Sequence, residues 1–73
     1  MIRDLDIVVL NIDLPEHRLK RGDVGTVVLS HGAKGYEVEF TALDGETVVV
    51  VSVKSLDVRS IGRREIAHAR SIE

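Results

Sequence analysis

The sequence predicts an all-β domain, a small barrel of five or six short antiparallel strands. Three observations predict it: a hairpin signal at Asp44-Gly45, valine concentrated in three short runs, and turn-forming residues between those runs. β-Branched side chains fit a pleated, half-buried surface, and short strands separated by turns are typical of small barrels. A chain of 73 residues buries one small core, so we expect a single domain over residues 1–73.

The most specific signal is the hairpin expected between Tyr36 and Val53. An Asp-Gly pair between two strand-like runs favours a two-residue type I′ turn, which needs positive φ angles at both positions. Counting outward from Asp44-Gly45 predicts the register. The expected pairs are Phe40–Val49, Val38–Val51 and Tyr36–Val53 on one face, and Thr41–Val48, Glu39–Val50 and Glu37–Ser52 on the other. The first face is wholly apolar, so we expect it to face the core.

The other elements follow from the apolar runs and the turn residues. The expected strands are residues 7–10, 24–29 and 56–59, and the expected connections are 11–23 and 30–35. Residues 7–10 are apolar throughout, which predicts burial on both sides. Pro15 excludes a central strand from the long connection, which Ile12, Leu14 and Leu19 should hold against the core. Gly25 indicates a bulge or a close backbone approach. One long connection after the first strand, followed by tight turns, indicates an SH3-like barrel.

The C-terminal segment, residues 63–72, fits two structures. As a short helix it would place Ile66, Ala69 and Ile72 on one side. As a sixth strand it would pair with the first strand and cover an exposed edge, and we prefer this alternative.

Composition narrows the function classes. The net charge is −2, whereas a general nucleic-acid-binding protein usually has a basic surplus. There is no cysteine, so neither a disulfide nor a thiolate metal site is available. The sequence carries no catalytic or nucleotide-binding motif, so we expect no enzymatic activity and no cofactor. An apolar leader and a membrane-spanning run are both absent from the sequence, so we expect a cytoplasmic protein without membrane contact.

Carboxylates and histidines give no convincing metal or acid–base site. Glu65 and His68 have the spacing of half a carboxylate-bridged metal site, but only on a helix and only with a second copy of the motif. Glu37 and Glu39 share the outer face of the hairpin, where we expect solvated surface acids. His17 and His31 lie in loops without further ligands at suitable spacing. We therefore expect no metal.

A basic loop is the first candidate binding site. Its residues are His17, Arg18, Lys20 and Arg21. They could contact phosphates or an acidic partner, and in a nucleic-acid-binding protein Arg63 and Arg64 would extend the surface. The alternative is a solvated loop, because charged loop residues are most often surface only.

Val48 and Val50 form the second candidate site. The expected register places both valines on the outward face of the hairpin, beside Glu39 and Thr41. Either the C-terminal segment covers them, or they form an apolar surface for a partner protein. A second copy of the chain could also occupy that surface.

Several ordered motifs carry a resemblance to a known family. They are residues 13–28 (DLPEHRLKRGDVGTVV), 36–40 (YEVEF), 43–47 (LDGET), 57–59 (DVR) and 65–70 (EIAHAR). With these motifs the chain resembles a bacterial family of unknown function, numbered 4926. The resemblance implies a small cytoplasmic protein without assigned chemistry. Because some relatives are encoded beside toxin-like proteins, it also implies an antitoxin or immunity-type role.

A second similarity covers residues 20–28 (KRGDVGTVV), which resemble the KOW-type motif of SH3-like barrels that bind RNA or transcription complexes. The leading hypothesis is nevertheless a non-catalytic protein-interaction module with a protein partner. The alternatives are an RNA- or ribosome-associated module and a homo-oligomeric structural domain.

Overall fold

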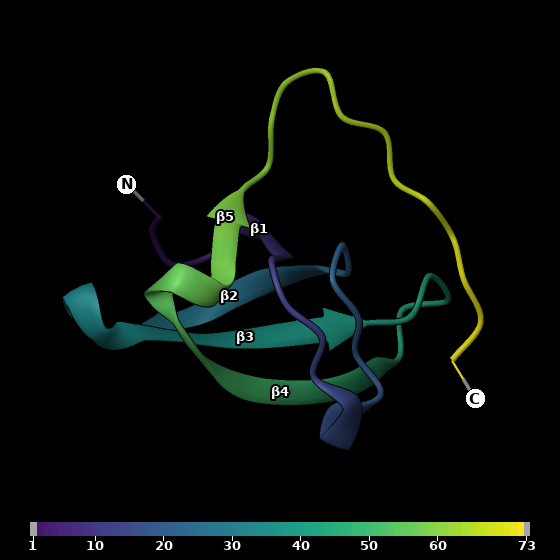
Figure 1. Cartoon of the computed structure of the whole chain (residues 1–73), viewed down its shortest axis with the longest axis horizontal. Helices are drawn as coiled ribbons and strands as arrows, with labels where there is room; N and C mark the ends of the chain where they lie inside the picture. Colours follow the sequence, from purple (N-terminus) through teal and green to yellow (C-terminus); the bar gives the residue numbers. More distant parts are fainter. Residues whose placement is uncertain (1, 73) are drawn as a thin grey trace.

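The computed structural model describes residues 2–72, which form one five-stranded antiparallel sheet. The strands are β1 (Ile7–Leu10), β2 (Val24–Ser30), β3 (Gly35–Thr41), β4 (Thr47–Lys54) and β5 (Val58–Ser60). Their order across the sheet is β4-β3-β2-β1-β5. The curved sheet folds around its apolar face (Figure 1), which confirms the small all-β, barrel-like fold.

The long connection after β1 is ordered by a short 3₁₀ turn, η1 (Pro15–His17). Proline fixes φ near the value that such a turn requires and has no N–H to leave unpaired. Leu14 and Leu19, on either side of the turn, form two backbone hydrogen bonds. The N–H of Leu14 donates to the carbonyl of Leu19 (2.9 Å), and the N–H of Leu19 donates to the carbonyl of Leu14 (3.1 Å). Leu19 is buried in the core and Leu14 packs against it. The expected anchoring of this loop is confirmed for Leu14 and Leu19, but it is wrong for Ile12, which is exposed and outside the core cluster.

The register of the β3–β4 hairpin is as expected over most of its length, but its turn differs. From Phe40–Val49 outward, all five expected pairs form. At the turn, the N–H of Gly45 donates to the carbonyl of Ala42 (2.9 Å), and Gly45 has a positive φ of 97° whereas Asp44 does not. The loop therefore has three residues, a turn followed by a left-handed glycine, and the expected type I′ turn is wrong.

A bulge at Val48 absorbs the extra loop residue. Thr41 pairs with Thr47 instead of the expected Val48, and the register shifts before Phe40–Val49. One added residue in the loop and one unpaired residue in β4 cancel, so the core-facing set keeps its face.

The core consists of aliphatic residues and the two aromatic ones. Its buried members are Val8, Leu10, Leu19, Val27, Tyr36, Val38, Phe40, Val51, Val53 and Val58. Within β1, Val9 is buried outside this cluster, while Ile7 is exposed, so the expectation that β1 is buried throughout on both sides is wrong at its first residue.

Gly25 marks a close backbone approach, as expected. A Cβ at this position would lie 2.6 Å from Cγ1 of Val38 and 3.0 Å from the carbonyl oxygen of Glu39. The irregularity in β2 lies elsewhere, between Val27 and Leu29.

Two expectations for the last third of the chain are wrong. The fifth strand begins at Val58 rather than at residue 56, because Ser55–Asp57 forms a 3₁₀ turn, η3. Residues 61–72, called the tail below, form neither a helix nor a sixth strand. Both edges of β1 are already paired, with β2 and with β5, so no edge of β1 remains for the tail. As a helix, the short segment would lack the packed apolar face that stabilises short helices.

Candidate protein-binding surfaces

β4 is an edge strand of the sheet, and the backbone groups on its outer side are unpaired within residues 2–72. It pairs only with β3, and among residues 2–72 no backbone hydrogen bond reaches its other edge. Such an edge presents a row of N–H and C=O groups that another strand can pair with. Val50 lies in the middle of this strand with 48% of its surface exposed. We call Val50, its cross-strand neighbour Glu39 and the unpaired edge the β4 surface.

The two outward valines have different surroundings. Val48 is half-buried and lines a cavity of about 480 Å³ together with Ala67, His68 and Ala69 of the tail. Val50 is not among the residues that line this cavity, and it remains exposed. Of the two interpretations of this face, coverage by the C-terminal segment therefore describes Val48, and a free apolar surface describes Val50.

Hydrogen-bonded acids flank Val50. The hydroxyl of Thr47 donates to the carboxylate of Glu39, and the hydroxyl of Ser52 donates to that of Glu37. His31 Nε2 also lies 3.0 Å from Glu37 Oε2. The hydrogen bond from Ser52, followed by that from His31, lowers the pKa of Glu37. Protein interaction sites combine an apolar centre with a polar rim, and Val50 with these acids has this arrangement on the scale of one side chain.

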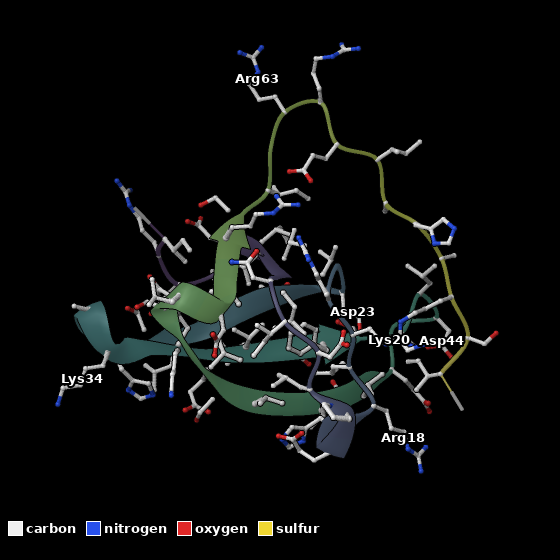
Figure 2. All side chains as sticks on the ribbon, viewed as in Figure 1. Arg18, Lys20, Asp23, Lys34, Asp44 and Arg63 are labelled. Atoms are coloured by element: carbon white, nitrogen blue, oxygen red, sulfur yellow. The ribbon has the colours of Figure 1, made fainter. Side chains whose placement is uncertain are left out.

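The basic residues do not form one surface. His17, Arg18, Lys20 and Arg21 share the β1–β2 connection, but the N–H groups of Lys20 and Arg21 donate to the carboxylates of Asp23 and Asp13. These acids reduce the positive charge of the loop. Figure 2 shows Arg63 at the opposite end of the molecule from Arg18, and Arg64 follows Arg63 in the same exposed stretch of the tail.

Sequence reasoning missed an ion pair that holds the tail. Arg70 Nε donates to Asp23 Oδ1 (2.9 Å), Arg70 Nη2 donates to Asp23 Oδ2, and Nη2 also donates to the carbonyl of Arg18 (3.0 Å). Burial alone would raise the pKa of Asp23, but the hydrogen bonds from Arg70 and from the Lys20 N–H lower it below its usual value. The pair is 47 residues apart in sequence and lies in irregular segments, so no periodicity could indicate it.

A second ion pair fixes the start of the tail. Both guanidinium nitrogens Nη1 and Nη2 of Arg59 donate to the carboxylate of Glu65 at 2.7 Å. The Arg59 bond, with the N–H of Gly62, lowers the pKa of Glu65 from 4.5 to about 2. A lowered pKa means that this contact is intact above pH 4.5 and is lost as the pH falls through about 2.

An NMR pH titration of the Glu65 side-chain carboxyl carbon tests this contact. We expect a midpoint near pH 2 in the wild-type chain and a higher midpoint, still below 4.5, in an Arg59→Gln variant, because the N–H of Gly62 remains bound to Glu65. A wild-type midpoint near 4.5 would contradict the ion pair.

The half-motif Glu65-x-x-His68 is not on a helix, and Glu65 is bound to Arg59 instead. Among residues 2–72, no group of three or more His, Asp or Glu side chains could hold a metal ion. No helix within the described part of the chain is both long and apolar enough to cross a membrane.

Fold and surface together define a small all-β domain of SH3-like architecture whose sheet ends in two edge strands within residues 2–72, the long β4 and the three-residue β5. The family model of a domain of unknown function, DUF4926, matches residues 4–60, so the chain belongs to this family. The match includes all five strands and ends before the tail, which leaves the motif at residues 65–70 outside it. A comparison with curated proteins and one with solved structures found no match.

Proposed function

We propose that this domain is a non-catalytic protein-interaction module whose β4 surface pairs with an extended segment of a partner protein. The observation that carries the proposal is the unpaired edge of β4 beside the exposed Val50. Strand addition obtains affinity from main-chain hydrogen bonds and specificity from the neighbouring side chains. Here Val50 supplies the apolar contact, and Glu37 and Glu39 supply the polar rim.

The finer form of the proposal is an antitoxin or immunity-type role in a bacterial cytoplasm, with a toxin-like neighbour as the partner. Its support is the family resemblance alone.

Self-association through the same edge is a second candidate, favoured by the charges at the two ends of β4. If two copies paired antiparallel about Val50, Lys54 of one copy would lie opposite Glu46 of the other. Such a cross-strand pair of opposite charges is stabilising, and the two Val50 side chains would cover each other. This arrangement would make the domain homo-oligomeric.

Capture from an extract of the native host tests the proposed class of function. A tagged wild-type chain is used with and without nuclease, and the bound proteins are identified by mass spectrometry. We expect one stoichiometric protein that resists nuclease and about 1 M salt, where the screening length falls to about 3 Å.

Two results would contradict the proposal. Partners that vanish with nuclease and weaken steeply with salt would indicate the RNA-associated alternative. An absence of partners, combined with a mass that rises with protein concentration, would indicate self-association.

A further inference from the structure

The tail is attached to the rest of the molecule at few points. It leaves β5, bends away from the sheet and returns toward the β3–β4 turn (Figure 1). Within the described chain, Glu65 and Arg70 are the only residues of 61–72 that form hydrogen bonds with residues 2–60. Between these two residues Ile66 is 95% exposed. The tail is therefore an extended segment held at two ion pairs.

The acceptor for Arg70 belongs to the domain itself. The Asp23 carboxylate also accepts the N–H of Lys20 (2.8 Å), and the N–H of Asp23 donates to the carbonyl of Lys20 (2.9 Å). This turn positions the carboxylate without the tail. The side chains of Asp23 and Arg70 are 18% and 28% exposed, so the contact is partly shielded from water. A bidentate contact with a carboxylate is specific for arginine, because lysine lacks the planar guanidinium group with its parallel N–H donors.

The tail only partly fills the space that it covers. Beside the Arg70–Asp23 contact, the cavity of about 480 Å³ lies between Phe40, Val48 and Leu43 on one side and the small side chains of Ala67 and Ala69 on the other. A neighbouring cavity of about 650 Å³ is lined by Ile61 and Ile66 of the tail. Both spaces are open to solvent, since the lining residues Leu43 and Ile66 are 92% and 95% exposed. Their volumes are in the range of ligand-binding clefts. We call this region, from Asp23 to Val48, the tail cleft.

We propose that the tail cleft binds an extended segment of another protein that carries an arginine preceded by apolar side chains larger than alanine. The arginine would replace Arg70 at Asp23 and at the Arg18 carbonyl, and the apolar side chains would fill the space that Ala67 and Ala69 leave. In the free chain the tail occupies the cleft as a weak internal ligand. The family match supports this division, since Arg18 and Asp23 lie inside it and Arg70 lies outside. The proposal does not depend on the β4 surface.

A binding experiment with the full chain tests the proposal. The probe is a capped peptide of residues 63–72 carrying Ala67→Leu and Ala69→Leu, and its matched control also carries Arg70→Gln. Binding is followed by NMR at the amides of Asp23 and Val24. We expect an Arg70→Gln chain to bind the probe at least about 10-fold more tightly than the wild-type chain, because the attached tail competes at a millimolar effective concentration.

The control peptide and a second protein variant establish the site. The Arg70→Gln chain should bind the control peptide at least about 10-fold more weakly than the probe, because the control peptide lacks the arginine that makes the bidentate contact with Asp23. Adding Asp23→Asn should weaken probe binding by a similar factor. Since the control peptide leaves the protein unchanged, the test remains valid even if Asp23→Asn unfolds the chain.

Three results would overturn the proposal. The first is that the Arg70→Gln chain binds neither peptide, and the second is that it binds both equally. The third is that sedimentation finds a wild-type dimer that becomes a monomer with Arg70→Gln, which would assign the cleft to the tail of a second copy. These three results do not depend on whether the capture experiment finds a partner at the β4 surface. The two proposals can therefore fail independently.

Discussion

Replacing Gly35 with alanine is expected to destabilise the fold by about 3 kcal/mol, at the upper end of the usual cost of overpacking. A Cβ at this position would lie 2.2 Å from the carbonyl oxygen of Val53 and 3.3 Å from the Cα of Lys54. Both are backbone atoms of β4, and Gly35 is the first residue of β3 to pair with that strand. The clash can be relieved only if β4 moves away from β3.

Thermal and urea unfolding measure this effect. About 3 kcal/mol corresponds to a fall in Tm of roughly 12–24 °C for a domain of this size. The control is Gly32→Ala: no atom lies within 4 Å of its added Cβ, so only the left-handed φ of 70° opposes the substitution. That conformation costs about 1–2 kcal/mol. Equal losses in the two variants would contradict the close approach of Gly35 to β4.

Much of the fold could be predicted from the sequence because local signals and tertiary packing agree. The valine runs became strands, and Pro15 lies in the long connection outside every strand, as expected. The alternation of apolar and polar residues in β3 fixed the face that it buries. Since a register slip of one residue would turn that face outward, the pairing from Phe40–Val49 onward was strongly determined.

The β3–β4 turn could not be predicted to the residue. Asp44-Gly45 is compatible with a two-residue turn and also with a three-residue loop that ends in a left-handed glycine. The bulge at Val48 makes the second choice compatible with the same core register. The sequence carries no local signal that distinguishes the two, because both keep the same valines buried.

The candidate sites were predictable only in part. The outward position of Val50 followed from the register, and coverage by the C-terminal segment was one of the two alternatives for this face. The bulge at Val48 did not follow from the register, and the sequence did not distinguish Val48, which lies beside the tail, from the exposed Val50. The Arg70–Asp23 contact joins two irregular segments through side chains, and such contacts leave no periodic trace in a sequence. The expectation of a sixth strand was wrong because β5 had already taken the free edge of β1.

The second large effect is expected at Val50, where a charge should abolish partner binding and leave the domain folded. Val50 is 48% exposed and makes no contribution to the buried core cluster. An aspartate at this position would face Glu39 across the strands, and like charges directly opposite are destabilising. A lysine would face the same carboxylate favourably. The pair Val50→Asp and Val50→Lys therefore separates an effect on binding from an effect on the fold.

The matched control is Val28→Asp, which introduces the same charge at a valine that is 40% exposed on β2, away from the β4 edge. Circular dichroism and thermal unfolding should find all three variants folded. Within the set, Val50→Asp should have the lower Tm of the two position-50 variants, because only lysine complements Glu39. If both position-50 variants unfold, Val50 belongs to the core and the β4 surface does not exist as described.

Calorimetric titration of the captured partner protein into the wild-type chain and these three variants tests the proposed interaction most directly. An unpaired charge buried at an interface costs about 2–5 kcal/mol. We therefore predict that Val50→Asp weakens binding by about 30-fold or more, at about 1.4 kcal/mol per tenfold change, that Val50→Lys, whose charge faces Glu39, weakens it by a smaller factor of about tenfold, and that Val28→Asp leaves the affinity unchanged. Affinities of both position-50 variants within about threefold of the wild-type value would contradict binding at the β4 surface.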